Sequence, residues 1–279
     1  MNFKNNIDDI LDPQEISNLD FKLEIVEVRH AENINSNLKE ELIDKGWSEL
    51  TKSWDEIKQP FFNSELFYFE GFSQSKTNLA IKVSKSTSYK KTVGLRYWRE
   101  SLENRSKLSK IELQATKTLS AIVIIKNHKG EILFRVREGG DWPQSLELPG
   151  GFVRTHELDL RQSLTNRLHD DLNIDFMHSN LKIIRFLHLK DIYECMIVFE
   201  LAIDERQDKE IHKNDKFQKL IFISKNELAD INNQGVNIHP KIKLPFHYPS
   251  QIVVEHVFKG IKKTRLGREL KLKLENITN

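Results

Sequence analysis

The pattern of apolar and polar residues predicts three β-strands in the first third of the chain. In residues 21–28, FKLEIVEV, apolar and charged residues alternate from Phe21 to Ile25, as in a strand with one buried face. Residues 65–72 and 78–84, ELFYFEGF and NLAIKVS, are rich in aromatic and aliphatic residues and are separated by a short polar turn.

The apolar pattern becomes denser from residue 119 onward. Residues 120–126, SAIVIIK, are almost continuously apolar, which predicts a buried strand, and the turn 127–130 leads into a second strand at 131–138. After residue 175 the segments 181–189 and 191–203 predict a further hairpin. One more strand is predicted at 217–223, and a capping box is predicted between Ser224 and Glu227.

Three segments have helical rather than strand periodicity. In residues 37–58, large apolar side chains recur at helical spacing until Gln59-Pro60 ends the pattern. Leucines recur at every fourth position from 160 to 172, and Asn173 follows as a C-cap in the left-handed conformation. Residues 250–262 predict a third helix, near the C-terminus.

Composition indicates an ordinary soluble protein rather than a binder of polyanions. The 279 residues include 38% hydrophobic and 30% charged side chains, and the net charge is only +2. Cys195 is the only cysteine and lies in an apolar run, which predicts a small buried side chain. No segment has the apolar length of a signal sequence or a membrane span, so we expect a cytoplasmic protein that does not contact membranes.

The candidate chemistry lies in residues 146–174. Leu146 and Leu148 alternate like a strand, Pro149 ends it, and a Gly150-Gly151 turn would permit positive φ and a close backbone approach. The leucine helix that follows carries its acids off the apolar stripe: Asp170 and Asp171 stand three and four positions after Arg167, so the three side chains share one face.

This stretch resembles the Nudix box, whose pattern is G-x5-E-x7-R-E-U-x-E-E-x-G-U with U aliphatic. The opening G-x5-E is matched by Gly151 and Glu157. With one inserted residue, the later aliphatic and acidic positions are matched by Leu168, Asp170, Asp171 and Ile174. Two departures stand out, because Asn166-Arg167 replaces the Arg-Glu pair and Asn173 replaces the glycine.

The resemblance implies a loop-helix-loop that holds Mg²⁺ or Mn²⁺ against a diphosphate. Glu157, Asp170 and Asp171 would be the metal ligands and catalytic groups that orient water, and Gly150 and Gly151 would let the diphosphate approach. Arg167 removes a negative charge and adds a positive one, which should weaken or abolish metal binding. We therefore predict that Arg167 pairs with Asp170 or Asp171 and partly replaces the cation. The structural alternative is a solvated helix face with weak ion pairs.

Further candidate contacts lie outside this stretch. Residues 86–96, STSYKKTVGLR, are expected to form a loop in which Lys90, Lys91 and Arg96 bind phosphate, unless it is simply a solvated connection. Residues 87–94 resemble a segment of the animal UDP-glucose diphosphatase branch of the Nudix superfamily, which also ends its box in Asn, as at Asn173.

A strand and a loop before the box supply three more candidates. Arg135 and Arg137 are expected on the strand face opposite Phe134, where they could meet a phosphate or line an exposed sheet. Trp142, in the loop 139–143, could stack on a base or sugar, or could simply pack.

Four other side chains rank below these as candidates. Glu194 and Glu200 could complete a metal site, and His156 and His169 could act as acid or base, although exposed positions without a catalytic role are the preferred explanation for the histidines.

The expected fold is α/β, with a Nudix-like mixed β-sheet between helices over residues 116–231. An N-terminal α+β domain, 1–115, would help to form the ligand cleft, and 232–279 would form a C-terminal loop and helix that pack on the Nudix-like domain. The boundary falls in a polar connector without a Gly/Ser-rich linker, so we expect the two parts to pack as one body.

The function that the resemblance implies is hydrolysis of a nucleoside diphosphate linked to another moiety, with a UDP-sugar giving UMP and sugar 1-phosphate as the leading case. The alternative, which Arg167 favours, is a catalytically impaired protein that binds or senses a nucleotide sugar or ADP-ribose. The expected partner is thus a small nucleotide-linked molecule. A transcription regulator would need a DNA-reading helix pair, which the sequence does not present, so nucleic acid is not expected. The oligomeric state is left open.

Overall fold

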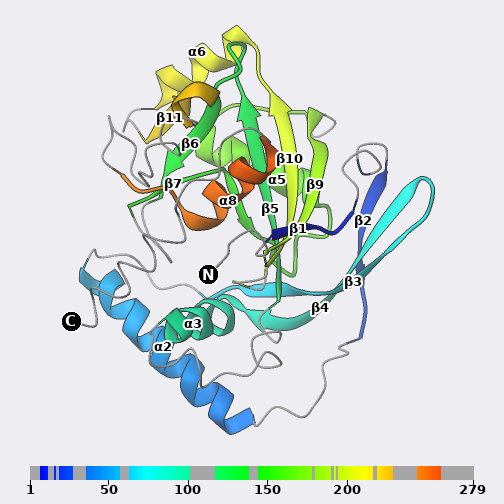
Figure 1. Ribbon diagram of the computed structural model, residues 1–279, viewed down its shortest axis with the longest axis vertical. Coiled ribbons are helices and arrows are strands. Elements are labelled where there is room, and N and C mark those ends of the chain that lie inside the picture. Colours follow the sequence, from blue (N-terminus) through cyan, green and yellow to red (C-terminus); the bar gives the residue numbers. More distant parts are fainter. Residues whose placement is uncertain are drawn as a thin grey trace.

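The computed structural model describes residues 7–11, 16, 19–27, 36–56, 63–100, 117–137, 144–177, 180–189, 192, 194–215, 219–228 and 244–258. One mixed sheet runs through them, and Figure 1 shows its strands side by side. Its main path, in spatial order, is β1 (Ile7–Asp9), β9 (Lys182–Leu189), β10 (Glu194–Ala202), β5 (Thr118–Lys126), β3 (Glu65–Gln74), β4 (Asn78–Ser88) and β2 (Asp20–Ile25). Neighbours are antiparallel except for two parallel pairs, β10 with β5 and β2 with β4.

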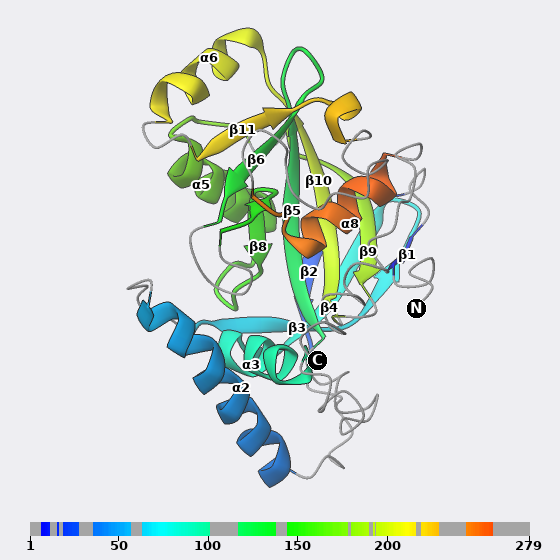
Figure 2. The same cartoon turned by 60° about the vertical axis from the view of Figure 1, so that its left-hand side comes forward.

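Four short strands branch from this path beside β5. They are β6 (Ile132–Val136), β7 (Leu146–Glu147), β8 (Gly150–Phe152) and β11 (Leu220–Ile223). β6 continues the β5 hairpin and pairs with both β7 and β11, whereas β8 pairs directly with the middle of β5. Figure 2 shows β8 between β5 and the helix that carries the predicted acids.

Helices cover both faces of the central strands. On β5, Ala121 and Val123 belong to the same core as the leucines of α5 (Leu160–Leu172), whereas Ile122 and Ile124 belong to a second core. That second core includes α8 (Tyr248–Val257). Because successive residues of a strand point to opposite faces, α5 and α8 cover opposite sides of the sheet (Figure 2). The prediction of an α/β protein with a mixed sheet between helices is therefore confirmed.

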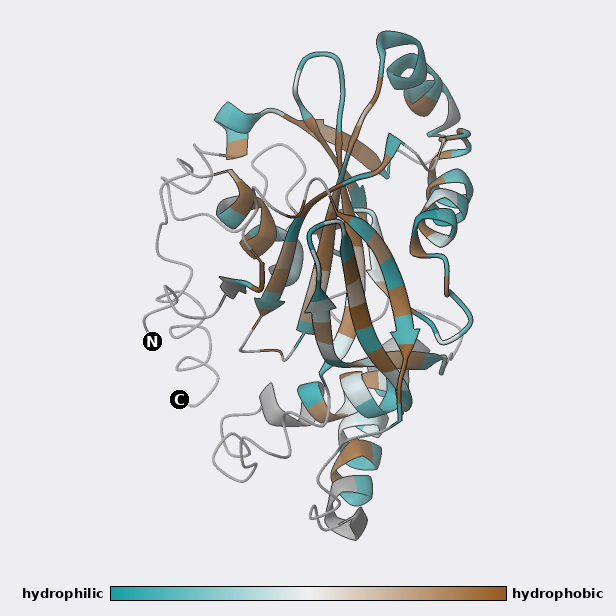
Figure 3. Cartoon of the chain, turned by 90° about the vertical axis from the view of Figure 1, so that its right-hand side faces the viewer, coloured by the Kyte–Doolittle hydropathy of each residue, from teal (hydrophilic) through white to brown (hydrophobic). Residues whose placement is uncertain are grey.

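The hydropathy of the chain follows this layering. Figure 3 shows the apolar colour concentrated on the central strands and on the inward sides of the helices. Burial explains it, because the central strand β5 is buried at eight of its nine positions. In the core, Cys195 is fully buried and burial raises the pKa of its thiol to about 12, which confirms the predicted buried cysteine. Among the described helices, none combines the length and apolar character that crossing a membrane would require.

The sheet crosses the predicted boundary between residues 115 and 116. Strand β3 pairs with β5 at Tyr68 and Thr118, and the N-terminal strand β1 pairs with β9 at the far edge. Residues 101–116 lie outside the described part, as does the predicted end of the domain at 231, so the domain limits stay a prediction.

Two helices next to β3 and β4 show that one sequence prediction is wrong. Residues 86–96 do not form a loop: β4 continues to Ser88, and α3 (Tyr89–Glu100) begins immediately, packed against α2 (Ser36–Glu56) (Figure 1). The glycine that indicated a loop is a packing residue, because a Cβ at Gly94 would lie 2.8 Å from the Ile43 carbonyl oxygen in α2. The hydroxyls act locally, since Ser88 Oγ accepts from the Lys91 amide at 3.3 Å.

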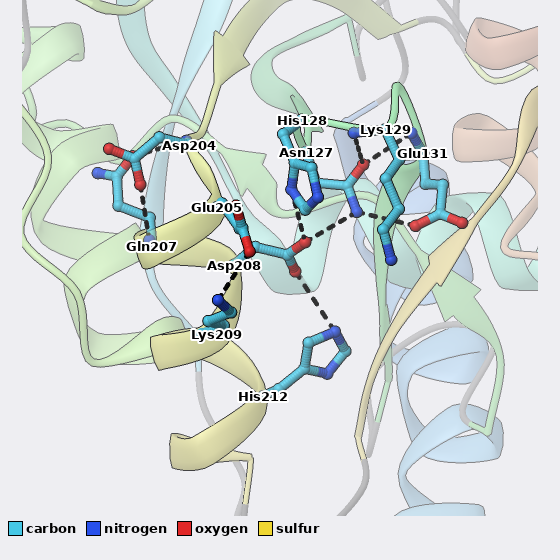
Figure 4. Close-up of polar contacts among 10 residues, drawn as sticks. All are labelled: Asn127, His128, Lys129, Glu131, Asp204, Glu205, Gln207, Asp208, Lys209 and His212. Atoms are coloured by element: carbon cyan, nitrogen blue, oxygen red, sulfur yellow. Dashed lines mark hydrogen bonds and ion pairs between the residues drawn. The ribbon is translucent and has the colours of Figure 1, made fainter.

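A helix absent from the sequence prediction, α6 (Glu205–Asn214), is capped by a reciprocal pair of hydrogen bonds between Asp204 and Gln207. Figure 4 shows how Asp208 joins this helix to the turn after β5. Its carboxylate lies 3.1 Å from Asn127 Nδ2, 3.2 Å from His128 Nδ1 and 3.4 Å from His212 Nε2. We call Asn127, His128, Asp208 and His212 the α6 clasp.

Candidate functional site

The two adjacent glycines lie in strand β8 rather than in a turn, which corrects the sequence prediction. Both have positive φ, +130° for Gly150 and +143° for Gly151, a conformation that glycine adopts without strain. A Cβ at Gly150 would lie 2.3 Å from the Ala121 carbonyl oxygen and 2.7 Å from Ile122 Cα, which is too close for any side chain. The predicted close backbone approach therefore exists, and in this structure the approaching backbone is that of β5.

Arg167 of α5 is held by Glu157, not by the aspartates of its own helix. Its Nε and Nη2 donate to Glu157 Oε1 at 3.0 and 2.6 Å, and Nη2 also contacts Oε2. The same Nη2 donates to the Phe152 carbonyl oxygen at 2.8 Å, while Glu157 Oε2 accepts from the Arg154 amide at 2.6 Å. Both carboxylate oxygens of Glu157 are thus occupied, and the residue is only 7% exposed.

The predicted pairing of Arg167 with Asp170 or Asp171 is therefore wrong. Arg167 stays near enough to Asp171 for its charge to oppose the rise in the pKa of that carboxyl, but side chains on a helix point back toward its N-terminus. Glu157 lies in that direction, in the loop before α5. Because its carboxylate is buried, leaving it without a cationic partner would cost more than leaving an exposed carboxylate unpaired.

Two further arginines, both on β6, hold a second buried carboxylate. Arg135 Nε donates to Glu147 Oε1 at 2.8 Å and Arg137 Nη1 donates to Oε2 at 2.5 Å, while Arg135 Nη1 also pairs with Asp171 of α5. Neither arginine simply lines an open sheet face. We call Arg135, Arg137, Arg167, Glu147, Glu157 and Asp171 the arginine–carboxylate cluster.

The two carboxylates bonded to Arg135 have pKa values that shift in opposite directions. Burial alone would raise the pKa of Glu147, but Arg137 and Arg135 outweigh it and hold that pKa below its ordinary value. For Asp171 burial dominates and raises the pKa, with Glu147 and Asp170 adding to the rise and Arg135 opposing it. Glu147 is therefore the firmly ionised member of the pair.

The predicted metal ligands do not fit a divalent ion in this arrangement. Mg²⁺ needs several oxygen ligands that are free to coordinate. Glu157 is covered by Arg167 and Asp171 is paired with Arg135, which leaves the exposed Asp170 as the carboxylate of the three that has no ion pair among the described residues. In the part of the chain that the structure describes, no three His, Cys, Asp or Glu side chains gather as a metal site would require. No step through a metal ion follows from this geometry.

Lys90, Lys91 and Arg96 of α3 contact residues outside the arginine–carboxylate cluster. Lys90 pairs with Asp44 of α2, and Lys91 lies 3.9 Å from Glu40 of the same helix. Arg96 is 6% exposed, and its guanidinium lies 5.3 Å from the centre of the Phe152 ring.

The lower-ranked candidates are occupied or exposed. Arg96 donates to Glu194 at 3.0 Å, and Glu200 pairs with Lys126. His156 is exposed, and His169 is an exposed partner of Asp175 at 3.0 Å. Trp142 lies outside the described residues.

Glu147 is the site residue that the sequence analysis missed. It is 4% exposed and stands between two buried leucines, Leu146 and Leu148. A carboxylate inside such an apolar segment needs a cationic partner. The alternating arginines of the preceding strand, Arg135 and Arg137, were the available signal for that partner.

No family model and no curated protein matches the sequence significantly. Among solved structures, the chain is similar to a MutT/nudix family protein from Enterococcus faecalis, with 15% identity, a TM-score of 0.30 and coverage of 38% of this chain and 42% of that one. A mutT/nudix family protein from Listeria innocua has 14% identity and a TM-score of 0.35, covering 56% of this chain and 97% of that one.

A third similar structure is a bifunctional NMN adenylyltransferase/ADP ribose pyrophosphatase from Francisella tularensis, with 12% identity, a TM-score of 0.36 and coverage of 59% and 49%. The chain therefore spans less than half the length of the Enterococcus and Francisella proteins. Likenesses at this level do not assign a function.

Proposed function

We propose that this protein binds the diphosphate of a nucleotide-linked small molecule beside the arginine–carboxylate cluster, and that it does so without a divalent ion and without cleaving the ligand. The class of ligand is supported by the resemblance of residues 146–174 to the Nudix box. The observation that carries the rest is the Arg167 side chain, which occupies both oxygens of Glu157.

Charge balance supports a site that works without metal. Within the cluster, three carboxylates (Glu147, Glu157 and Asp171) face three arginines (Arg135, Arg137 and Arg167). A divalent cation is drawn to a local excess of negative charge. Since the charges here already match, an added ion would have to displace an arginine.

Displacing Arg167 would be costly. Glu157 is buried, and removing one partner of a buried ion pair costs about 3 to 5 kcal/mol because the other charge is left uncompensated. A metal ion would have to offset this cost before it could activate water or a phosphate. This barrier favours binding over hydrolysis.

Two contacts join the N-terminal part to strand β8 and the loop that follows it. Thr155, in the loop between β8 and Glu157, donates from its hydroxyl to the Glu65 carboxylate at 3.2 Å, and Arg96 lies against the Phe152 ring. We propose that residues 1–115 hold β8 and this loop in place, and that Lys90 and Lys91 serve the contact between α3 and α2 rather than the ligand.

The ligand and its fate can be identified with one panel. Purified protein would be mixed with UDP-glucose, UDP-galactose, ADP-ribose, NADH and nucleoside triphosphates, in EDTA and separately with Mg²⁺ or Mn²⁺. Thermal shifts would report binding and mass-resolved chromatography would report products. We expect at least one nucleotide-linked diphosphate to raise the melting temperature in EDTA, with no product formed in either condition.

The opposite result would support the hydrolase function that the resemblance to the Nudix box implies. Metal-dependent release of UMP and sugar 1-phosphate, abolished by the double substitution Asp170→Asn with Asp171→Asn, would mean that Arg167 leaves Glu157 during turnover. The double variant is the control that separates this activity from a contaminating phosphatase.

A further inference from the structure

We infer that Arg167 fills the place of a cation in this site: two of its nitrogens neutralise Glu157, and the third, Nη1, contacts a phosphate of the ligand. This inference rests on the proposed function and names the residue that would make the ligand contact. It also predicts that one substitution will turn the site into a cation site.

The use of the guanidinium nitrogens supports a free donor. Nε and Nη2 donate to Glu157 and to the Phe152 carbonyl oxygen. Nη1 has no hydrogen-bond partner within the described ranges, and the Arg167 side chain is 22% exposed, so this nitrogen is the donor that remains available. A guanidinium fixed by a carboxylate on one side and free on the other is suited to phosphate.

Gly151 lies next to this donor. A Cβ built on Gly151 would lie 3.6 Å from Arg167 Nη1, so the space beside the nitrogen is bounded by backbone without a side chain. Any larger side chain at position 151 would extend into that space, and its φ of +143° disfavours one. A phosphate oxygen can therefore approach Nη1 over Gly151.

The same geometry predicts what a carboxylate at position 167 would do. A glutamate there would point toward Glu157, as the arginine does, and would share a helix face with Asp170 and Asp171. These oxygens would be close together with Arg135 as the remaining nearby cation on Asp171. Such a set of hard oxygen ligands binds a divalent ion.

The test uses Mn²⁺ alone, without nucleotide, on the full chain. Electron paramagnetic resonance would count bound Mn²⁺, and thermal melts would show whether the ion stabilises the fold. We expect Arg167→Glu to bind Mn²⁺ at least about tenfold more tightly than the unchanged protein and to melt at a higher temperature when the ion is present.

Asn166→Glu is the matched control. It adds a carboxylate at the neighbouring, exposed position of α5, about 100° around the helix from Arg167. This variant is expected to bind Mn²⁺ no better than the unchanged protein. An equal gain in both variants would show that any added acid on α5 attracts the ion, and the inference would be overturned.

Arg167→Gln keeps the test decisive if two facing glutamates prevent folding. It frees Glu157 without adding a charge, so we expect a smaller gain in Mn²⁺ affinity that still exceeds the control. No gain in either folded variant, with circular dichroism unchanged, would overturn the assignment of Arg167 to the cation's place.

The anion contact has a separate readout. Calorimetry with inorganic diphosphate in EDTA should show about tenfold weaker binding for Arg167→Gln than for the unchanged protein. Equal affinities would overturn the phosphate contact. Failure of the unchanged protein to bind any nucleotide would instead count against the proposed function, and the Mn²⁺ result would be unaffected, so the two failures can be told apart.

Discussion

Two buried carboxylates in this protein are neutralised in different ways. Glu157 in the arginine–carboxylate cluster is 7% exposed, and Asp208 in the α6 clasp is 5% exposed. The Glu157 carboxylate accepts hydrogen bonds from the Arg167 guanidinium, whose positive charge is permanent at any pH at which the protein is folded. The Asp208 carboxylate accepts a hydrogen bond from the side-chain amide of Asn127 and lies beside His128 and His212.

The difference is whether one residue or several compensate the buried negative charge. Most of what compensates Glu157 comes from one residue, Arg167, so removing that residue leaves a buried charge. Asp208 has several partners, and the His212 side chain is 60% exposed, so that partner contributes little. Under the proposed function, the first arrangement takes the place of an added ion, whereas the second attaches helix α6 to the turn after β5.

The largest expected effect is that of Arg167→Ala, which should lower the free energy of unfolding by about 3 to 5 kcal/mol because Glu157 stays buried without its partner. Urea unfolding followed by circular dichroism measures it. Removing both partners, Glu157→Gln with Arg167→Met, should recover more than half of the loss. A loss below about 1 kcal/mol for the single variant would mean that Glu157 is not held as described.

Glu147→Gln is expected to have the next largest effect, about 1 to 3 kcal/mol near neutral pH, because Arg135 and Arg137 lose a buried ionic partner. The effect should depend on pH. The folded state lowers the pKa of Glu147, so its contribution is present above the ordinary glutamate pKa and is lost as the pH falls through the lower pKa of the folded protein.

Melting curves from neutral to acidic pH measure this dependence. The difference in stability between the unchanged protein and Glu147→Gln should narrow as the pH drops below about 4. A difference that is constant over the whole range would show that Glu147 contributes through shape and neutral hydrogen bonds rather than through its charge.

For the α6 clasp, Asp208→Asn should cost about 1 to 2 kcal/mol, because an amide keeps the shape of the side chain but replaces a carboxylate oxygen that accepts from Asn127 or contacts His128. His212→Gln is the comparison, and its effect should stay below about 0.5 kcal/mol since that ion pair is exposed. If Asp208→Asn were as damaging as Arg167→Ala, the contrast between the two regions would not hold.

Among the carboxylate substitutions, the smallest effect is expected for Asp171→Asn, and its pH dependence should have the opposite sign to that of Glu147→Gln. Burial raises the pKa of Asp171, so its contribution to stability is present below the ordinary aspartate pKa and is lost as the pH rises through the higher pKa of the folded state. The variant should therefore gain stability relative to the unchanged protein as the pH rises, by less than about 1 kcal/mol. Thermal melts in a pH series would detect it, and a gain toward acid instead would contradict the raised pKa.

Local periodicity was enough to predict most of the elements. The leucines of α5 are all buried, and Asn173 has the predicted left-handed conformation, with φ of 54° and ψ of 39°. Both features depend on neighbours in the sequence, and for that reason a single sequence reveals them. Helix α6 was not predicted because it is largely polar, and a single buried apolar residue, Ile211, packs it against the core.

Contacts between distant residues were less predictable. Helical spacing places Asp170 and Asp171 near Arg167, but the choice of Glu157 depends on the path of the loop before α5 and on burial, neither of which the spacing contains. In the same way a loop was predicted around Gly94, whereas the structure shows that a glycine is needed there because α2, about fifty residues earlier, packs against it. The pairing of β1 with β9 is a still longer connection.

The most direct test of metal-independent binding is calorimetric titration of the unchanged protein with UDP-glucose or ADP-ribose, first in EDTA and then in excess Mg²⁺. With Arg167 in the cation's place, the affinity for the ligand that binds should agree within about threefold between the two buffers. Binding that appears only with Mg²⁺ would show that an ion, and not the guanidinium of Arg167, completes the site.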